Sequence, residues 1–189
     1  MPSVTTGGAY VAFRLAMDHP HAVRRLTVMD AVPILAALER CNSHFAASWW
    51  HWFFFAQPDK PERAINADPN AWYGDSPRKR AQIGEAWNDY QAAIHDPQTV
   101  RCMLEDYRAG LGVDCRHDLE DRDAGRRLAC PTTLLWALQD DLVDLYGDPL
   151  EVWRPWATRL DGQGIDCGHH ISEEAPDALA LLLIDASHD

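Results

Sequence analysis

Two short apolar segments limit what this chain can fold into: LTVMDAVP at 26–33 and CPTTLLWAL at 130–138. Both are rich in β-branched and aliphatic residues, which is typical of strands buried on both faces of a parallel sheet. Helical patterns flank each of them, and a weaker strand pattern occurs near 158–166. This alternation of helices and strands predicts an α/β fold.

A long helical stretch separates the first two predicted strands. Residues 34–109 are rich in helix formers and aromatic residues and contain no strand pattern. Within this stretch, Asp96 and Pro97 have the form of an N-cap and a first-turn proline, and Gly110 is typical of a helix end. Upstream, apolar residues at three- and four-residue spacing predict a helix over 7–18. The pattern therefore predicts a helical insertion in an α/β core.

Composition excludes several classes of protein. The chain has 189 residues, of which 47% are hydrophobic, so it can bury a core as one domain with a subsidiary lobe. It carries 29 acidic and 17 basic side chains, a formal net charge of −12 that leaves no basic face for nucleic acid. The longest apolar stretches, 45–57 and 178–184, are too short or too interrupted to cross a bilayer, and the first residues do not resemble a secretory signal. We therefore expect neither a nucleic-acid nor a membrane partner.

Cysteine usage indicates a reducing compartment. The five cysteines are far apart, odd in number and without a CxxC pair, so we expect a cytoplasmic protein. Two groups invite a metal interpretation, namely His169 and His170 with the nearby Asp166 and Cys167, and Cys115 with His117. Neither group has a second pair of residues at ligand spacing, so we expect neither a metal nor another cofactor.

Two residues have the chemistry of an acid–base pair. Asp30 follows the first predicted strand, and open α/β sheets place their chemistry at the carboxyl ends of strands. His169 lies in a glycine-histidine loop near the C-terminus. A carboxylate that holds one imidazole tautomer allows the imidazole to take a proton from a nucleophile or from water. The alternative is that Asp30 is only a turn or cap residue, and sequence spacing leaves both interpretations open.

Five motifs occur in order along the chain. They are MDAVP at 29–33, WHWFFFAQP at 50–58, EDYRAG at 105–110, LEVWRPWA at 150–157 and CGHHISEEAP at 167–176. Together they resemble haloacetate dehalogenases, enzymes of the α/β-hydrolase superfamily whose best-known substrate is fluoroacetate. The resemblance extends from about Leu15 to about Leu183. It implies a partial α/β-hydrolase fold with the latter strands of the sheet, in which 1–33 and 116–189 form the core and 34–115 form a helical cap.

The resemblance also implies a reaction. In that family an aspartate displaces halide from the substrate, and water activated by a histidine hydrolyses the resulting ester. Carried over by position, Asp30 orients the histidine and His169 is the general base. The halide pocket is formed by His51, Trp52 and Tyr107, whose rings offer three hydrogen-bond donors to a departing fluoride. The alternative for Trp52 and Tyr107 is an ordinary place in the core.

The nucleophile elbow departs from the family pattern. Aligned without a gap from LAMDHP, the family's Gly-His-Asp-Arg-Gly-Gly/Ala-Arg corresponds to VTTGGAY. Thr6 then occupies the nucleophile position, and Gly7 and Tyr10 replace two arginines that bind the substrate carboxylate in the family. A threonine hydroxyl needs a base to attack and would form a different kind of intermediate. We therefore expect impaired or absent activity in the chain as written.

The strands that precede the elbow in the family have no counterpart in this sequence. Two explanations are open: Met1 is a misassigned start, or the gene is disrupted or partial. In either case the strand at 26–33 would lack a neighbour, and an exposed parallel edge promotes pairing with another chain. We therefore expect a homo-oligomer or a poorly soluble protein.

Three functions are left open. The first is hydrolysis of the carbon–halogen bond of a small anionic substrate such as a haloacetate, with water and without a cofactor. The second is an inactive fragment or an association module. The third is an epoxide hydrolase, which has a similar fold and a similar acid–histidine pair. Epoxide hydrolases generally use cap tyrosines, whereas a histidine, tryptophan and tyrosine trio favours halide.

Overall fold

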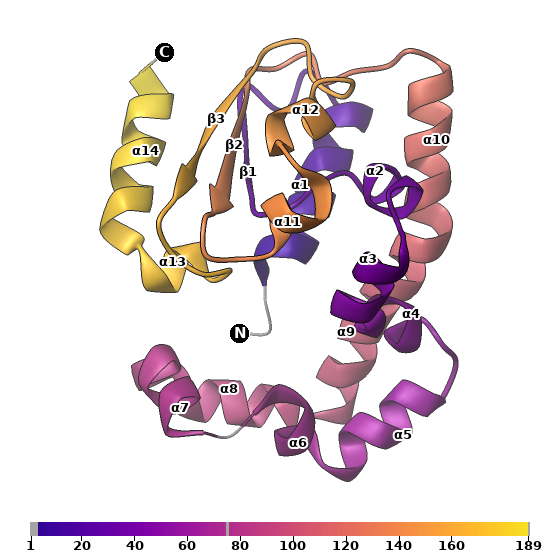
Figure 1. Cartoon of the computed structure of the whole chain (residues 1–189), viewed down its shortest axis with the longest axis vertical. Coiled ribbons are helices and arrows are strands. Elements are labelled where there is room, and N and C mark those ends of the chain that lie inside the picture. The colour runs from indigo at the N-terminus through magenta and orange to yellow at the C-terminus, as the bar shows by residue number, and fades with distance from the viewer. Residues whose placement is uncertain (1–3, 75, 189) are drawn as a thin grey trace. The chain divides into compact units, whose positions relative to one another are not determined.

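The computed structural model describes residues 4–74 and 76–188, except the side chains of 4–6, 78, 82 and 185–188. The chain forms two compact units, a helical unit of residues 42–115 and a sheet unit of residues 4–41 and 116–188 (Figure 1). The sequence places the start of the insertion at residue 34, whereas the structure places it at residue 42. A buried hydrogen bond explains the difference.

Helix α2 (Ile34–Glu39) is tied to the sheet unit. The buried carboxylate of Asp118, on α10 (Cys115–Asp123), accepts a hydrogen bond of 3.1 Å from the backbone N–H of Leu35. A buried amide at the start of a helix needs such an acceptor, because the first helical N–H groups have no partner in the helix itself. The contact therefore holds α2 in the sheet unit.

The sheet has three parallel strands, β1 (Leu26–Met29), β2 (Thr132–Ala137) and β3 (Leu160–Ile165), in the order β1-β2-β3. Leu26 pairs with Thr132, and Thr132 pairs with Leu160, so the strands begin at the same level. Figure 1 shows the strands side by side and running in the same direction. The predicted α/β class is confirmed, and all three predicted strands are present.

Strand β3 has a weak strand pattern in the sequence because two of its residues are glycines, which have no side chain. A Cβ atom at Gly162 would lie 2.0 Å from the backbone oxygen of Leu134 on β2. Real atoms cannot approach so closely, so the backbones of β2 and β3 require glycine at this position. The residue that weakens the strand pattern is therefore one that the strand pairing needs.

Helices pack on the sheet through aromatic and aliphatic side chains. Helix α1 (Val4–Asp18) lies against β1, and α12 (Pro149–Trp153) lies against β2 and β3. Phe13 of α1 meets the ring of Trp153 edge to face, with ring centroids 5.3 Å apart. The indole N–H of Trp153 donates to the backbone oxygen of Ala31 at 2.8 Å, which satisfies a buried polar group beyond β1.

A second cluster involves the helices that follow β3, namely α13 (Ile171–Glu174) and α14 (Pro176–His188). Its buried members come from β2, from β3 and the loop after it, and from these two helices: Leu135, Ala137, Ile165, Cys167, Ile171 and Leu179. Leu135 and Ala137 are two residues apart and so point to the same face of the sheet. The cluster fixes the loop between β3 and α13 from one side.

The helical unit contains short helices with polar caps. Its helices are α3 (Ser43–Ser48), α4 (Trp50–Phe55), α5 (Lys60–Ala67), α6 (Pro69–Tyr73), α7 (Pro77–Ile83), α8 (Trp87–Ile94) and α9 (Pro97–Ala109), with a 3-10 turn at Gly84–Ala86. Asp96 caps α9 as predicted, because its carboxylate accepts from the N–H groups of Gln98 and Thr99. The helix does not stop at Gly110 but continues as a π-helical turn over Gly110–Asp114. The predicted helical insertion is thus present.

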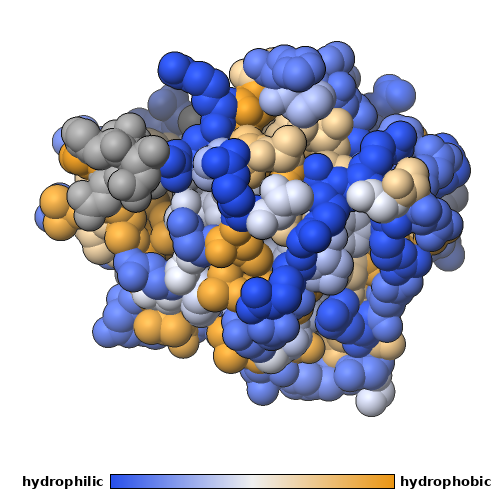
Figure 2. All heavy atoms as spheres, turned by 90° about the horizontal axis from the view of Figure 1, so that it is seen from above, coloured by the Kyte–Doolittle hydropathy of each residue, from blue (hydrophilic) through white to orange (hydrophobic). Residues whose placement is uncertain are grey.

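One face of the molecule is largely hydrophilic. Hydrophilic residues cover most of the face seen in Figure 2, and apolar residues are interspersed among them. Across the described residues, no helix combines the length and the apolar character that a membrane span requires.

Candidate active site

Three side chains that can take part in acid–base chemistry lie just beyond the carboxyl ends of the three strands. Asp30 directly follows β1, Asp140 lies in the turn after β2, and His169 lies in the loop between β3 and α13. Because the strands are parallel, their carboxyl ends share one edge of the sheet, which is where open α/β sheets place their ligands. The topology alone therefore brings these side chains together.

Asp30 is held in a strained and buried position. Its φ angle is +47°, in the left-handed region that non-glycine residues rarely adopt. Its N–H donates to the backbone oxygen of Leu135 at 2.8 Å, and its Oδ1 atom accepts from the N–H of Ala137 at 3.0 Å. Two bonds to β2 thus offset the strain and aim the second carboxylate oxygen along the edge of the sheet.

His169 meets that second oxygen. Its Nδ1 atom lies 2.6 Å from Oδ2 of Asp30, so the structure brings the two sequence-predicted residues into hydrogen-bond contact. The carboxylate of Glu174 supports the loop by accepting the N–H groups of Gly168, at 2.9 Å, and His170, at 3.3 Å. The hydrogen bonds to Glu174 thus fix the backbone of the residue before His169 and of the residue after it.

Asp140 is the site residue that sequence reasoning missed. Its Oδ2 atom lies 2.8 Å from the same Nδ1 atom of His169. The signal was present, because the sequence QDD at 139–141 directly follows the second predicted strand. The rule that selected Asp30, a carboxylate at the carboxyl end of a strand, applies equally to Asp140.

The charges of the three groups are linked. Hydrogen bonds that His169 donates to the carboxylates of Asp140 and, second, Asp30 raise its pKa to about 10, against the burial that opposes its charge. The hydrogen bond with His169 lowers the pKa of Asp140 to about 2. Burial raises the pKa of Asp30, although its bonds to His169 and Ala137 act in the opposite direction. Because the Nδ1 proton is directed at carboxylates, acid–base chemistry with water would use Nε2.

Among the described residues, these three have the geometry that comes nearest to that of a metal site. Asp30, Asp140 and His169 each offer one ligand atom within 4.8 Å of the others. Tetrahedral zinc needs a fourth ligand, and here the nitrogen already bonds the two carboxylates. Of the sequence-suggested ligands His169 belongs to this group, whereas Asp166 accepts from the side chain of Gln139. The arrangement is therefore that of a histidine oriented by acids.

The residues proposed for halide binding lie in the helical unit. The rings of His51, on α4, and Tyr107, on α9, pack edge to face with centroids 5.9 Å apart. Trp52 is buried, and its ring lies 5.1 Å from that of Trp49 and 5.8 Å from that of Phe45. The structure thus brings His51 and Tyr107 together and places Trp52 in an aromatic cluster.

The predicted nucleophile position lies on α1. Thr6 belongs to this helix, but its side chain is outside the described residues, as is Met1. Gly7 and Tyr10 lie on the same helix. Neither residue carries a positive charge, so these two positions cannot bind a substrate carboxylate as arginines would.

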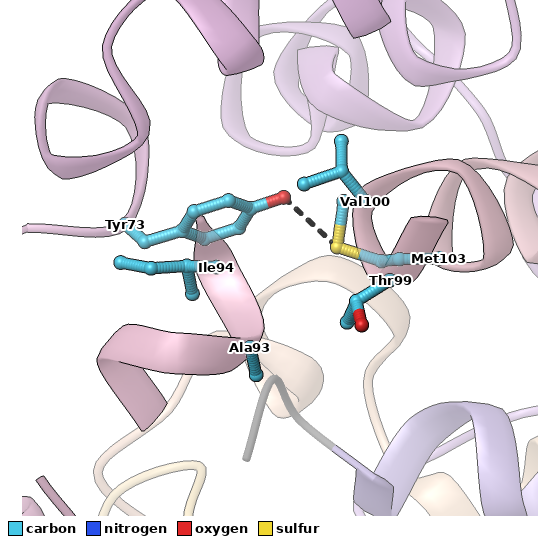
Figure 3. Close-up of a pocket in the computed structure, with 6 residues that line it drawn as sticks. All are labelled: Tyr73, Ala93, Ile94, Thr99, Val100 and Met103. Carbon is cyan, nitrogen blue, oxygen red and sulfur yellow. Dashed lines mark hydrogen bonds between the residues drawn. The ribbon is translucent and has the colours of Figure 1, made fainter. Parts of the chain in front are cut away.

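A small cavity in the helical unit is lined by residues of α6, α8 and α9: Tyr73, Ala93, Ile94, Thr99, Val100 and Met103 (Figure 3). Its volume is about 10 Å³, which is room for about one water molecule. The hydroxyl of Tyr73 donates to Sδ of Met103 at 2.9 Å across it. The cavity is too small for an organic acid and offers no charged group.

No family model matches the chain. Among curated proteins, it is 30% identical over 183 residues to a fluoroacetate dehalogenase from Burkholderia sp, covering 93% of this chain and 59% of the relative. It is also 26% identical over 181 residues to a soluble epoxide hydrolase from Corynebacterium sp. (strain C12), covering 89% of this chain and 60% of the relative. The chain therefore spans about three fifths of the length of these relatives.

Comparison with solved structures also finds hydrolases that the chain matches over part of their length. A candidate epoxide hydrolase from Pseudomonas aeruginosa is 43% identical, with a TM-score of 0.83, and the match covers 96% of this chain and 63% of that one. A candidate alpha/beta hydrolase from Nostoc sp PCC 7120 is 33% identical, with a TM-score of 0.85 and coverage of 94% and 62%. The homologues thus include both a dehalogenase and epoxide hydrolases. The chain has a partial α/β-hydrolase fold, and its relatives belong to the α/β-hydrolase superfamily.

Proposed function

We propose that this chain supplies the water-activating part of a hydrolase of haloacetate dehalogenase type. The observation that carries the proposal is the contact of 2.6 Å between Nδ1 of His169 and the buried carboxylate of Asp30. A carboxylate in this position fixes the Nδ1–H tautomer, so that Nε2 can accept a proton from water. The substrate would be a small anionic haloacid, and water is the only other reactant.

The proposed reaction has two steps. In the first, a carboxylate oxygen attacks the halogen-bearing carbon, an ester bond forms, and the carbon–halogen bond breaks with release of halide. In the second, Nε2 of His169 takes a proton from water while the water oxygen attacks the ester carbonyl, and the ester bond breaks to release the hydroxyacid. The proton returns to the departing alkoxide. His169 and Asp30 serve the second step.

The first step is where this chain departs from the family. Thr6 stands at the position of the attacking carboxylate, and Gly7 and Tyr10 stand at the positions of the two anion-binding arginines. A net charge of −12 also opposes the approach of an anionic substrate. We therefore expect impaired or absent halide release by the chain as it stands, because the position that forms the ester carries no carboxylate.

We assign halide stabilisation to His51 and Tyr107 of the helical unit. Their adjacent rings present an imidazole N–H and a phenol O–H, which are the donors that a small, strongly hydrated anion needs when it leaves water. Burial raises the pKa of Tyr107 to about 12, which keeps its hydroxyl protonated in the range where a hydrolase would be assayed. Trp52 completes the proposed set through its indole N–H.

The test is release of fluoride from fluoroacetate and of chloride from chloroacetate, measured with ion-selective electrodes on the purified chain. Wild type should release little or no halide, Thr6→Asp should turn over, and adding His169→Gln to Thr6→Asp should stop turnover after at most one halide per chain, because halide leaves before His169 acts. Asp161→Asn, at an exposed position of β3, is a control for the loss of one charge and should behave as wild type. Repeated turnover, with more than one halide released per chain, that survives His169→Gln would overturn the proposal.

An epoxide hydrolase is the second candidate. The 43% identity to the candidate epoxide hydrolase from Pseudomonas aeruginosa favours it, as do the half-buried tyrosines Tyr73 and Tyr107 in the helical unit. A phenol that stays protonated could donate to the oxygen of an opening epoxide. Formation of the diol from styrene oxide, measured beside halide release on the same variants, decides between the two reactions.

An association module is the third candidate. Strand β1 has one hydrogen-bonded neighbour in the described sheet, and Val11 and Leu15, one turn apart on α1, are 71% and 46% exposed. An unpaired strand edge beside exposed apolar side chains favours pairing with a second copy. Sedimentation equilibrium would show a concentration-dependent dimer or larger species, and a monodisperse monomer without any halide release would leave neither role supported.

A further inference from the structure

Two carboxylates converge on one nitrogen of His169. The distances from Nδ1 are 2.6 Å to Oδ2 of Asp30 and 2.8 Å to Oδ2 of Asp140, both within hydrogen-bond range. The two aspartates come from different strands, one after β1 and one after β2. An imidazole Nδ1 carries at most one proton, so one acid is enough to fix the tautomer. The second acid therefore needs its own explanation.

The two acids differ in their surroundings. The Asp30 side chain is fully buried, and its other oxygen is bonded to the Ala137 N–H. The Asp140 side chain is 27% exposed and lies in a turn, with the N–H of Asp141 bonded to its carboxylate. Asp30 thus belongs to the framework of the sheet edge, whereas Asp140 is an acid that can be changed without emptying a buried position.

Other ionisable groups lie around His169, and they add no further acid at Nδ1. The ring of His170 has its centroid 5.5 Å away, and the carboxylate of Glu174 is bonded to backbone N–H groups on either side of His169. Asp166 accepts from Gln139, and Cys167 is a buried thiol whose pKa burial raises. The charge that acts directly on the imidazole comes from Asp30 and Asp140.

We infer that Asp140 is a second positioning residue for His169, so that this base is held by two acids at Nδ1. The inference rests on the proposed function for its catalytic meaning. Either acid alone can fix the tautomer, and together they give the Nδ1–H group two carboxylate acceptors, which are also bonded to each other. His169 should then be a stronger base than in a site with one acid, but it should be free of its proton only at alkaline pH.

The test is nuclear magnetic resonance titration of the ¹⁵N-labelled full chain. The His169 ring signals, among those of nine histidines, are identified by their loss in His169→Gln. Asp140→Asn should lower the midpoint of the His169 titration by at least ~1 pH unit, a tenfold change in its protonation ratio. Asp140→Glu should restore most of this change. Asp161→Asn, which removes one exposed carboxylate from the same sheet, should shift the midpoint far less.

Two outcomes would overturn the inference. One is an Asp140→Asn midpoint shift no larger than that of Asp161→Asn. The other, read on wild type alone, is a neutral His169 with its proton on Nε2, because neither acid would then hold Nδ1–H. Both the titration midpoint and the tautomer of His169 can be measured without catalytic turnover. A Thr6→Asp chain that releases no halide but shows the predicted titration would lose the proposed function and keep the role of Asp140.

Discussion

The backbone N–H of Ala137 donates to Oδ1 of Asp30 at 3.0 Å, so the last residue of β2 fixes the carboxylate that follows β1. Asp30 uses its other oxygen to contact His169. One buried carboxylate therefore joins two strand ends to the base of the candidate site. Stability and proposed catalysis depend on the same side chain, and variants must separate them.

Replacing Asp30 should show how much of its role is structural. Asp30→Ala leaves the fully buried N–H of Ala137 without its acceptor, which should lower the free energy of unfolding by about 1–3 kcal/mol. Asp30→Asn keeps an oxygen that can accept this bond and should cost less. Urea denaturation measures both values, and equal losses would show that the bond to Ala137 contributes nothing.

His169 should make the stability of the fold depend on alkaline pH. Its pKa of about 10 in the folded state lies above the ordinary value of 6.5, because Asp140 and Asp30 stabilise the imidazolium. A raised pKa gives stabilisation that is complete below 6.5 and is lost as the pH rises through about 10. The urea midpoint of wild type should fall across this window. His169→Gln should give a flatter profile, and parallel profiles would contradict the coupling.

Activity should follow the opposite trend with pH. A general base must be unprotonated to accept a proton from water, and with a pKa of about 10 His169 is mostly protonated at neutral pH. Halide release by Thr6→Asp should therefore rise as the pH increases toward 10. Adding Asp140→Asn should move this rise to lower pH. A rate that does not change with pH would mean that His169 is not the base.

The sequence predicted where the strands lie better than where they end. The apolar run 26–33 continues beyond β1, which ends at Met29 because the backbone of Asp30 turns into the left-handed region. Ala31 and Val32 are buried outside the sheet, so their apolar character marks the core and not the strand. Sequence periodicity indicates which residues are buried, but it does not indicate that a single residue has a positive φ.

The candidate site could be predicted in part for a similar reason. Asp30 and His169 follow strands, so the parallel topology that the sequence predicts brings them to one edge. Composition does not separate Asp140 from Asp141 or Asp144, which follow it along the same connection. Only the turn after β2 decides which of these carboxylates points toward the imidazole, and turn geometry depends on tertiary contacts.

A buried ion pair in the sheet unit should stabilise the fold far more than an exposed pair on the same arginine. The Asp121 side chain is fully buried and lies 2.7 Å from Nη1 of Arg14, and it also pairs with Arg126. Asp18, which is 53% exposed, contacts the same Arg14. Asp121→Ala should cost about 1.5–3 kcal/mol because it removes the buried carboxylate that Arg14 and Arg126 share. Asp18→Ala should cost about 0–1 kcal/mol. Similar urea midpoints for the two variants would contradict this difference.

Tyr107→Phe tests whether the helical unit stabilises the departing halide. The variant keeps the ring that packs 5.9 Å from His51 and 5.1 Å from Phe55 and removes only the hydroxyl, so folding should be preserved. Loss of one preorganised donor should lower halide release in the Thr6→Asp background by ~10²-fold. Tyr90→Phe is a matched control, since the Tyr90 hydroxyl donates to the backbone oxygen of Tyr73 and has no assigned role in the reaction. If both variants lower release equally, the hydroxyl of Tyr107 does not bind the halide, and its burial is explained by packing alone.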